Sequence, residues 1–377
     1  MYDAIVIGIG GMGSAAVYNL AVRGAKVLGL EQFNIPHELG ASHGINRIIR
    51  LAYSEDPRYV PLLRRAYELW HQLEHLANER LLFITGGIDA GPANGNIVRG
   101  SLLSCNAHHL SHEVFDAAAL NRKFPGFNLA ADMLAVYQQD GGFVLAERSI
   151  VNYVIGAQQL GAEIHGREHV LEWEANPDRV RVRTDRDRYV GRKLIVTAGP
   201  WASTVLPELA ELVIPERQVL IWTQPLVPNR FRLGAFPVFN MEGDEGRFYG
   251  FPVWGIPGFK IGKYHHRGEL VPDVGRMDRQ FHAEDEEVLR QAIRRYFPDA
   301  NGPTLSVTTC LFSNSPDEHF ILDLHPDFSN VAVAAGFSGH GFKFCSVVGE
   351  IMAELALEGG TKHDIRPFRL RRFANRL

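Results

Sequence analysis

Residues 2–31 of the chain read YDAIVIGIGGMGSAAVYNLAVRGAKVLGLE, a stretch that predicts strand, glycine turn, helix, strand and acid in that order. Residues 2–8 form a short apolar run rich in β-branched side chains, which is typical of a buried parallel strand. The pattern predicts a helix over residues 12–23. A second apolar run over residues 25–30 ends at Glu31. This order is that of a nucleotide-binding βαβ unit.

Three glycines in this stretch, Gly8, Gly10 and Gly13, form the pattern G-x-G-x-x-G. Gly8 allows a tight turn, Gly10 lets a pyrophosphate approach the backbone, and Gly13 lets the helix sit close to the sheet. Free N–H groups and the helix dipole favour phosphate charge at this point. Glu31 is placed to accept hydrogen bonds from ribose hydroxyls. We therefore expect an ADP-containing cofactor, and this fingerprint alone does not separate FAD from NAD.

The composition is that of an ordinary globular protein, with 46% hydrophobic and 22% charged residues. The 39 Lys and Arg against 43 Asp and Glu give a net charge of −4, which offers no electrostatic basis for binding nucleic acid. No apolar segment suggests a membrane span, and the chain starts directly with the first strand, so we expect no cleaved signal. A length of 377 residues suggests two to three domain-sized units or two interleaved ones.

The cysteines, Cys105, Cys310 and Cys345, are scattered and form no C-x-x-C pair. They indicate neither a disulfide framework nor a zinc site, and no metal site is predicted. We expect a reducing, cytoplasmic compartment, in which Cys105 and Cys345 act as small buried hydrophobes. The basic end, residues 365–377, is interpreted as a solvated tail on the surface. The similarity of its last three residues to a peroxisomal address is treated as chance.

A polar segment at residues 32–50, QFNIPHELGASHGINRIIR, is too rich in Pro, Gly and His to predict regular structure. It brings Ser42, His43, Arg47 and Arg50 close together, soon after the cofactor-binding unit. Arg47 and Arg50 lie three residues apart and could share one face of a helical turn. Two guanidinium groups there suit pyrophosphate oxygens, a flavin ring or a substrate carboxylate. A basic pair on the surface is an equally good interpretation.

Apolar stripes predict amphipathic helices over residues 59–80, 146–160 and 283–297. Residues 81–139 have shorter runs and many turn residues, which indicates a departure from the first domain. The apolar strand and small-residue turn over residues 193–199 predict a return to that domain, as a later strand of its sheet. The chain is therefore expected to alternate between two structural units.

Lys260 lies in FYGFPVWGIPGFKIGKYHH, residues 248–266, where aromatic side chains predict paired strands. Its neighbours Phe259 and Ile261 face the other side of the strand, which is unusual for a solvated charge. An edge-strand lysine that blocks pairing with other chains is the alternative interpretation.

The last part of the chain repeats the strand, glycine turn and helix order. A buried strand over residues 331–335 leads into GFSGHGFK at residues 336–343 and a helix over about residues 342–357. This second helix start also presents free N–H groups and positive dipole character. We expect a negatively charged group before it, such as a reduced flavin with charge along N1 and the C2 carbonyl. An NAD-dependent dehydrogenase would share residues 1–31 but would not explain this second turn.

Together these motifs resemble the monomeric sarcosine oxidase and N-methyltryptophan oxidase family, flavin amine oxidases related to D-amino-acid oxidase. The similarity runs nearly end to end. It is carried by the glycine fingerprint with Glu31, SHGINRIIR at 42–50, YGFP at 249–252, FKIG at 259–262, Cys310 with DEHFILDLHP at 317–326, and GFSGHGFK at 336–343.

The resemblance implies an α/β fold of the D-amino-acid-oxidase type. A Rossmann-like FAD-binding domain, residues 1–83, 142–214 and 316–377, would be interleaved with a β-rich substrate domain, residues 84–141 and 215–315. The implied reaction oxidises the secondary amine of an N-methyl amino acid, reduces O₂ to H₂O₂, and yields an aldehyde once the imine is hydrolysed. Cyclic imino acids, glycated amino acids or a different electron acceptor remain alternatives, as does a sensor that binds FAD without catalysis. The protein is expected to act as a monomer.

The resemblance also assigns roles that spacing does not. The cysteine at Cys310 would carry FAD through an 8α-thioether, whereas the residues alone favour a buried core position. The lysine at Lys260 would lie over the flavin and stabilise charge that develops on oxygen. Arg50 and Lys343 would bind the substrate carboxylate, bidentately or from two sides.

Other positions would contact the cofactor or the substrate. Arg47 would lie beside the flavin and help to set its reactivity, and His43 and Tyr249 would face the flavin or the substrate. Further expected cofactor contacts are Ser42, Val170, Gly199, Gly339, His340, Gly341 and Lys343.

Two positions near the substrate depart from the sarcosine-oxidase pattern. Phe312 stands where the family has a tyrosine, and Tyr264 stands where it has a histidine. Loss of a phenolic hydroxyl removes a hydrogen bond, so we expect an altered pocket rather than a different reaction class.

Overall fold

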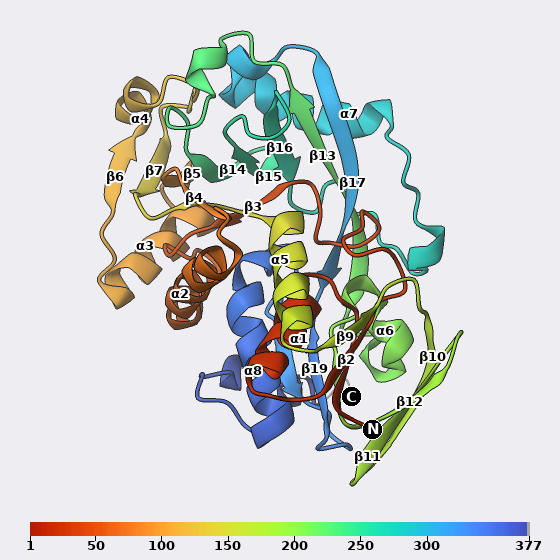
Figure 1. Cartoon of the computed structure of the whole chain (residues 1–377). Coiled ribbons are helices and arrows are strands. Elements are labelled where there is room, and N and C mark those ends of the chain that lie inside the picture. The colour runs from red at the N-terminus through yellow and green to blue at the C-terminus, as the bar shows by residue number, and fades with distance from the viewer. Residues whose placement is uncertain (375–377) are drawn as a thin grey trace.

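The computed structural model describes residues 1–374, and the three residues that loosely match a peroxisomal address lie outside them. Three sheets and eight α-helices make up the described chain (Figure 1). The helices are α1 (Gly11–Val22), α2 (Val60–Ala77), α3 (Asn96–His108), α4 (Ala117–Lys123), α5 (Ala146–Gln159), α6 (Ala202–Val205), α7 (Ala283–Tyr296) and α8 (Cys345–Glu358).

The first sheet has the strand order β10-β11-β12-β1-β2-β9, with β19 pairing to β12 and β18 to β19. Its strands are β1 (Tyr2–Ile7), β2 (Val27–Leu30), β9 (Glu163–His165), β10 (Val170–Asn176), β11 (Arg179–Thr184), β12 (Arg188–Val196), β18 (Ile321–Leu324) and β19 (Val331–Ala335). The strands β1, β2, β9, β12 and β19 run parallel.

Both faces of the first sheet are covered, which explains the unbroken apolar runs in its strands. Ala4 and Val6 point into the core beneath α1, α2, α5 and α8, while Ile5 and Ile7 point into a second core on the opposite face. Figure 1 shows α1 and α8 in front of this sheet, at the bottom of the molecule.

The second sheet has the order β17-β13-β16-β15-β14-β5-β7-β6 and lies at the top of Figure 1. Its strands are β5 (Gly87–Pro92), β6 (Glu113–Asp116), β7 (Met133–Gln138), β13 (Ile214–Thr223), β14 (Val238–Gly243), β15 (Gly246–Phe251), β16 (Phe259–Lys263) and β17 (Thr304–Asn314). One face packs on α7 through a core rich in phenylalanine. The two sheets draw on the chain segments expected for two domains, and that domain division stays a prediction.

A small third sheet, β3-β8-β4, joins β3 (Asn46–Ile49), β4 (Leu82–Ile84) and β8 (Gly142–Leu145). Its presence corrects two expectations for the polar segment at residues 32–50. The segment ends in a strand rather than staying irregular, and Arg47 lies on that strand rather than on a helical turn with Arg50. Antiparallel pairing of Arg47 with Val144, far along the chain, supplies the hydrogen bonds that local sequence does not reveal.

The glycine turn brings α1 onto the end of β1. A Cβ at Gly13 would lie 1.8 Å from the carbonyl oxygen of Gly8, so only glycine permits this approach. Gly8 itself has φ +89°, a conformation that L side chains rarely adopt, and it abuts the backbone of Thr197. The predicted roles of Gly8 and Gly13 in the turn and the packing are confirmed.

The basic end of the described chain is more than a solvated tail, which corrects the expectation for it. Ile365, Phe368, Leu370 and Phe373 are buried and extend two hydrophobic cores. The arginines between these apolar side chains are largely exposed or half-buried. The residues up to 374 therefore pack into the hydrophobic cores on the two faces of the first sheet, instead of forming a solvated tail.

No helix in the described part of the chain combines the length and apolar character that a bilayer crossing requires.

Candidate active site

A cavity of about 590 Å³ is lined by residues from the first sheet, the small sheet and the second sheet. Cavities of roughly 300–1,000 Å³ are typical of small-molecule and cofactor sites. Most of the predicted site residues line it: Gly8, Gly10, Glu31, Ser42, Arg47, Arg50, Val170, Gly199, Tyr249, Tyr264, Cys310, Phe312, Gly339, His340, Gly341 and Lys343. The three other predicted site residues, Gly13, His43 and Lys260, do not line it.

The glycine turn forms one end of the cavity. A Cβ at Gly10 would meet only the hydroxyl of Ser42, at 3.8 Å, so the space before α1 is open. Ser42 Oγ accepts a hydrogen bond of 3.3 Å from the Gly11 N–H. Glu31 accepts from the N–H groups of Ile9 (2.8 Å) and Phe33 (3.0 Å), which orients its carboxylate at the cavity wall. Burial raises the pKa of Glu31, and these N–H groups partly offset that effect.

Cys310 and Arg47 meet in the middle of the cavity wall. The Arg47 Nη2 lies 3.7 Å from Cys310 Sγ and donates to the carbonyl oxygen of Ala41 at 3.0 Å. Arg47 makes no ion pair within residues 1–374, so its charge is available both to the thiol and to the cavity. Cys105 and Cys345 are buried, as expected of small hydrophobes.

Lys260 and His43 are buried behind this wall. Lys260 lies on β16, between β13 and β15, so the interpretation as an edge-strand lysine is wrong. Its Nζ donates to Gly44 O (2.7 Å), Asn46 Oδ1 (2.8 Å) and Asn46 O (3.0 Å). Burial and the nearby Arg47 lower the pKa of Lys260 well below its ordinary value and that of His43 to about 3. The His43 Nε2 is buried without a hydrogen-bond partner in the described chain.

Arg50, just after β3, is part of a closed ring of hydrogen bonds at the other end of the cavity. Arg50 Nε donates to Asp89 Oδ1 at 3.2 Å, and Asn240 Nδ2 donates to the same oxygen at 3.2 Å. Arg247 Nε donates to Asn240 Oδ1 at 2.8 Å, and Arg247 Nη2 donates to Glu55 Oε1 at 2.6 Å. Arg50 Nη2 donates to Glu55 Oε2 at 3.1 Å and closes the ring. We call Arg50, Asp89, Asn240, Arg247 and Glu55 the charge ring.

One nitrogen of the Arg50 guanidinium, Nη1, takes no part in the charge ring. Nη1 is buried and has no hydrogen-bond partner among residues 1–374, although Arg50 lines the cavity. An orphaned guanidinium N–H is costly to bury, which indicates that a ligand oxygen completes it. With a single free nitrogen, Arg50 is arranged for one-sided rather than bidentate contact with a carboxylate.

Lys343 lies in the turn before α8 and lines the same end of the cavity. Its Nζ donates to the carbonyl oxygen of His340 at 2.7 Å and lies 5.2 Å from the centre of the Tyr53 ring. The Arg50 guanidinium lies 4.7 Å from the centre of the same ring. Burial, together with the charge of Arg50, lowers the pKa of Lys343 to about 7. The helix expected from residue 342 begins with a 3₁₀ turn, Phe342–Phe344, and α8 follows.

Three aromatic side chains form the wall beside these cations. The Tyr264 ring centre lies 5.2 Å from that of Tyr249 and 5.6 Å from that of Phe312. The Tyr249 and Tyr264 hydroxyls make no hydrogen bond with residues 1–374, so they can bond a ligand. The two positions that depart from the sarcosine-oxidase pattern, Phe312 and Tyr264, thus lie together on the cavity wall.

The other members of the charge ring could not be predicted from the sequence. Asp89 and Asn240 carry no local signal, because they join Arg50 only through the packing of the small sheet against the second sheet, and Glu55, five residues after Arg50, belongs to no motif. Arg247 had a weak signal: it stands two residues before Tyr249 on β15, so both side chains face the same side of that strand.

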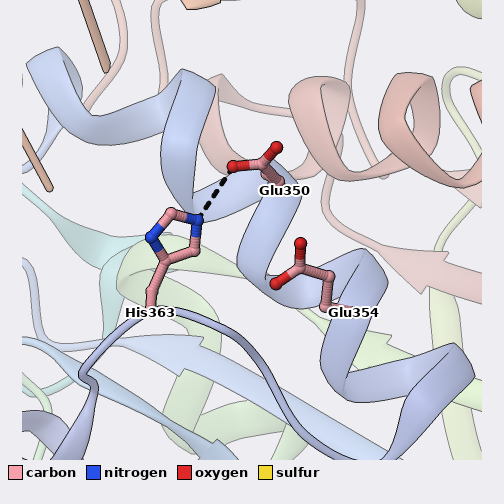
Figure 2. Close-up of side chains that lie close together, drawn as sticks. All are labelled: Glu350, Glu354 and His363. Carbon is pink, nitrogen blue, oxygen red and sulfur yellow. Dashed lines mark hydrogen bonds and ion pairs between the residues drawn. The ribbon is translucent and has the colours of Figure 1, made fainter. Parts of the chain in front are cut away.

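A separate group of ligand-type side chains, Glu350, Glu354 and His363, lies on and beside α8 (Figure 2). Both carboxylates are already engaged: Glu350 binds Arg65 (2.7 and 3.0 Å) and His363 (2.9 Å), and Glu354 binds Thr361. Arginine and lysine side chains balance their charge, so the group is an ion-pair network that fastens residues 361–363 to α8. It supports no metal proposal.

The comparisons with known proteins agree with this geometry. The family model described as FAD dependent oxidoreductase matches residues 3–355. The chain belongs to this family. It is an FAD-dependent oxidoreductase with the fold of the D-amino-acid-oxidase type.

Two relatives and one solved structure show which members of this family the chain is similar to. The chain is 41% identical to the monomeric sarcosine oxidase of Streptomyces avermitilis, over 99% of this chain and 98% of that protein. It is 35% identical to the N-methyl-L-tryptophan oxidase of Citrobacter koseri, over 99% of each chain. Among solved structures, NikD, an unusual amino acid oxidase of nikkomycin biosynthesis, superposes with a TM-score of 0.85 at 24% identity, over 98% of this chain and 97% of that chain.

The residues of the cavity fit the cofactor of an FAD-dependent oxidoreductase. The open space at Gly10 admits a pyrophosphate against the start of α1, and the oriented Glu31 carboxylate lies at the same end. Arg47 and the turn before α8 add uncompensated positive character farther along the cavity. The cavity therefore has matched features for a long anionic ligand at one end and a small anion at the other.

We predict that a small carboxylate binds this oxidoreductase with a pH dependence set by Lys343. A carboxylate beside Lys343 raises the pKa of this lysine above its value of about 7, so binding above that pH takes up a proton. Affinity is therefore constant below about pH 7 and falls by about tenfold per pH unit above it. Calorimetric titration with acetate between about pH 6 and pH 9 measures this slope. A flat profile, or an unchanged slope in Lys343→Met, would contradict the assignment.

Proposed function

We propose that the chain oxidises the secondary amine of an N-methyl or related amino acid, with O₂ as the electron acceptor. Water hydrolyses the imine product, which yields an aldehyde when the N-methyl group is oxidised, and O₂ leaves as H₂O₂. The observation that carries the proposal is the pair of cations at the end of the cavity, the unpartnered Arg50 Nη1 and Lys343 Nζ. The names of the relatives, monomeric sarcosine oxidase and N-methyl-L-tryptophan oxidase, support it.

Residues at the glycine end of the cavity would hold the FAD. Gly8, Gly10 and Ser42 would contact its pyrophosphate, and Glu31 its ribose. Val170, Gly199, Gly339, His340 and Gly341 would contribute further wall contacts. When bound, FAD accepts a hydride equivalent from the amine and passes two electrons to oxygen.

Arg50 and Lys343 would bind the substrate carboxylate from two sides. One N–H of Arg50 and the two free N–H groups of Lys343 would donate to it, each a charge-assisted hydrogen bond. Fixing the carboxylate holds the adjacent amine at one place along the cavity, which lowers the entropic cost of reaction. Tyr249 would line the substrate space beside them. The buried position of the cations excludes water from this contact.

Arg47 and Lys260 would supply positive electrostatic potential near the reacting groups, while His43, with its pKa lowered to about 3, would stand beside them as a neutral imidazole. Lys260 is held by three oxygen acceptors and lies within 4.3 Å of the Phe251 ring centre. Negative charge in the cavity would raise its depressed pKa and so favour the charged form of the amine. A cation there stabilises charge that develops on oxygen, which is the role we assign to Lys260.

We further propose that FAD is attached through an 8α-thioether to Cys310. The Arg47 guanidinium nitrogen lies 3.7 Å from Sγ, so a positive charge stands beside the sulfur that would form the bond. Acid precipitation should leave the yellow colour in the protein pellet, and Cys310→Ser should release it into the supernatant. Cys105→Ser, at a buried cysteine outside the cavity, is the matched control and should retain colour. Colour released from the unaltered protein would contradict covalent attachment.

The identity of the amine is set by the aromatic wall of Phe312, Tyr264 and Tyr249. Phe312 offers no hydroxyl where the sarcosine-oxidase pattern has one, so we expect a shift toward substrates with an apolar group there. Cyclic imino acids, glycated amino acids or another electron acceptor are the alternatives. The protein would act as a monomer in the cytoplasm.

A substrate panel tests this function directly. Sarcosine, N-methyl amino acids, pipecolate, proline and glycated amino acids are assayed for peroxide, and at least one N-methyl amino acid should produce it. Peroxide from pipecolate, proline or glycated amino acids alone would favour the alternative substrates. Turnover only with a dye acceptor would contradict the oxidase and leave a dehydrogenase, while no turnover with any acceptor would favour an FAD-binding sensor.

A further inference from the structure

Arg247 is half-buried beside the substrate end of the cavity, yet it does not line the cavity. Its guanidinium lies 4.0 Å from the centre of the Tyr264 ring, and it joins the charge ring through Asn240 and Glu55. Any effect of Arg247 on a ligand must therefore pass through the groups that it holds.

The strongest link from Arg247 runs to Glu55. The Arg247 Nη2 to Glu55 Oε1 distance is 2.6 Å, whereas the Arg50 Nη2 contacts to the two oxygens of Glu55 are 3.1 and 3.3 Å. Glu55 is thus shared between two arginines and lies closer to Arg247. Burial acts to raise the pKa of Glu55, but both arginines outweigh it and hold the carboxylate ionised.

The charges at this end of the cavity balance in a simple way. Glu55 and Asp89 offset two of the three cations Arg50, Arg247 and Lys343, so one positive charge remains for a ligand. Without Arg247, the same two acids would fully offset Arg50 and Lys343. The net attraction for a carboxylate would then be lost at the residues that bind it.

We propose that Arg247 is a positioning residue that keeps Glu55 from neutralising Arg50, so that Arg50 stays available to the substrate carboxylate. This inference rests on the proposed function, because it assumes a carboxylate at Arg50 Nη1. Glu55 competes with the substrate for the same guanidinium, and Arg247 holds that competitor aside. Arg247 thereby sets substrate affinity without touching the substrate.

The test compares Arg247→Met, Glu55→Gln and the double variant, with acetate as the probe in calorimetry and an N-methyl substrate in kinetics. In Arg247→Met the acetate Kd and the KM should rise about tenfold or more, while kcat changes less than about threefold. In Glu55→Gln acetate should bind about threefold tighter or more, because the competitor is gone. The double variant should return to within about threefold of the unaltered protein, since removing one charge of each sign restores the balance.

Two further variants separate this account from a general loss of structure. Arg247→Lys keeps the charge and should retain most of the affinity. Arg295→Met removes a half-exposed arginine of α7 that pairs with Glu245 in the turn between β14 and β15, outside the charge ring, and it should bind acetate normally.

Each contrary outcome has a distinct meaning. If the unaltered protein does not bind acetate, the carboxylate site of the proposed function is wrong and this inference falls with it. If it binds acetate and Arg247→Met binds equally well, only the role of Arg247 is wrong. If Arg247→Met loses affinity but Glu55→Gln does not restore it, the residue acts through packing and the competition with Glu55 is refuted. Should Arg247→Met fail to fold, unchanged acetate affinity in Glu55→Gln alone would overturn the proposal.

Discussion

The close contact between Gly13 and the carbonyl of Gly8 is the constraint on which the rest of the structure depends. It seats α1 directly on the end of β1, and this aims the start of the helix at the cavity. The parallel strands β1, β2 and β12 then end beside the same space, because parallel strands share one carboxyl edge. The turn before α8 adds a second helix start on that edge, so the cofactor end of the cavity concentrates positive backbone character.

The positive charge beside the cavity is balanced in a different way in the middle of the cavity than at its substrate end. In the middle, Arg47 makes no ion pair in the described chain and lines the cavity, so its charge is left for a ligand. At the substrate end the charge ring neutralises most of the positive charge internally and leaves one nitrogen of Arg50 and the amine of Lys343. The first arrangement suits a cofactor that stays bound, and the second suits a small anion that must enter and leave.

The sequence allowed much of this to be predicted, because its strongest signals are local. The glycine fingerprint, the strand Val331–Ala335 and the amphipathic helices have periodic or motif signatures, and the observed elements follow them closely. The spacing of Arg47 and Arg50 allows a shared helical turn, and local sequence does not reveal the strand, because the strand partner of Arg47, β8, lies far along the chain. The acids of the charge ring are hidden for two reasons: Asp89 meets Arg50 only when two sheets pack together, and Glu55, although five residues after Arg50, belongs to no motif. The proposal that the cofactor is attached at Cys310 rests on resemblance, since a buried cysteine on a strand has no signature of its own.

The central claim is that the paired cations select an amine that carries a carboxylate. The most direct measurement is anaerobic reduction of the bound flavin, followed by its visible absorbance, with sarcosine and with dimethylamine at equal concentrations of neutral amine. We expect sarcosine to bleach the flavin at least about 100-fold faster than dimethylamine does, because sarcosine makes two charge-assisted contacts that dimethylamine cannot make. Equal rates with the two amines would contradict the claim.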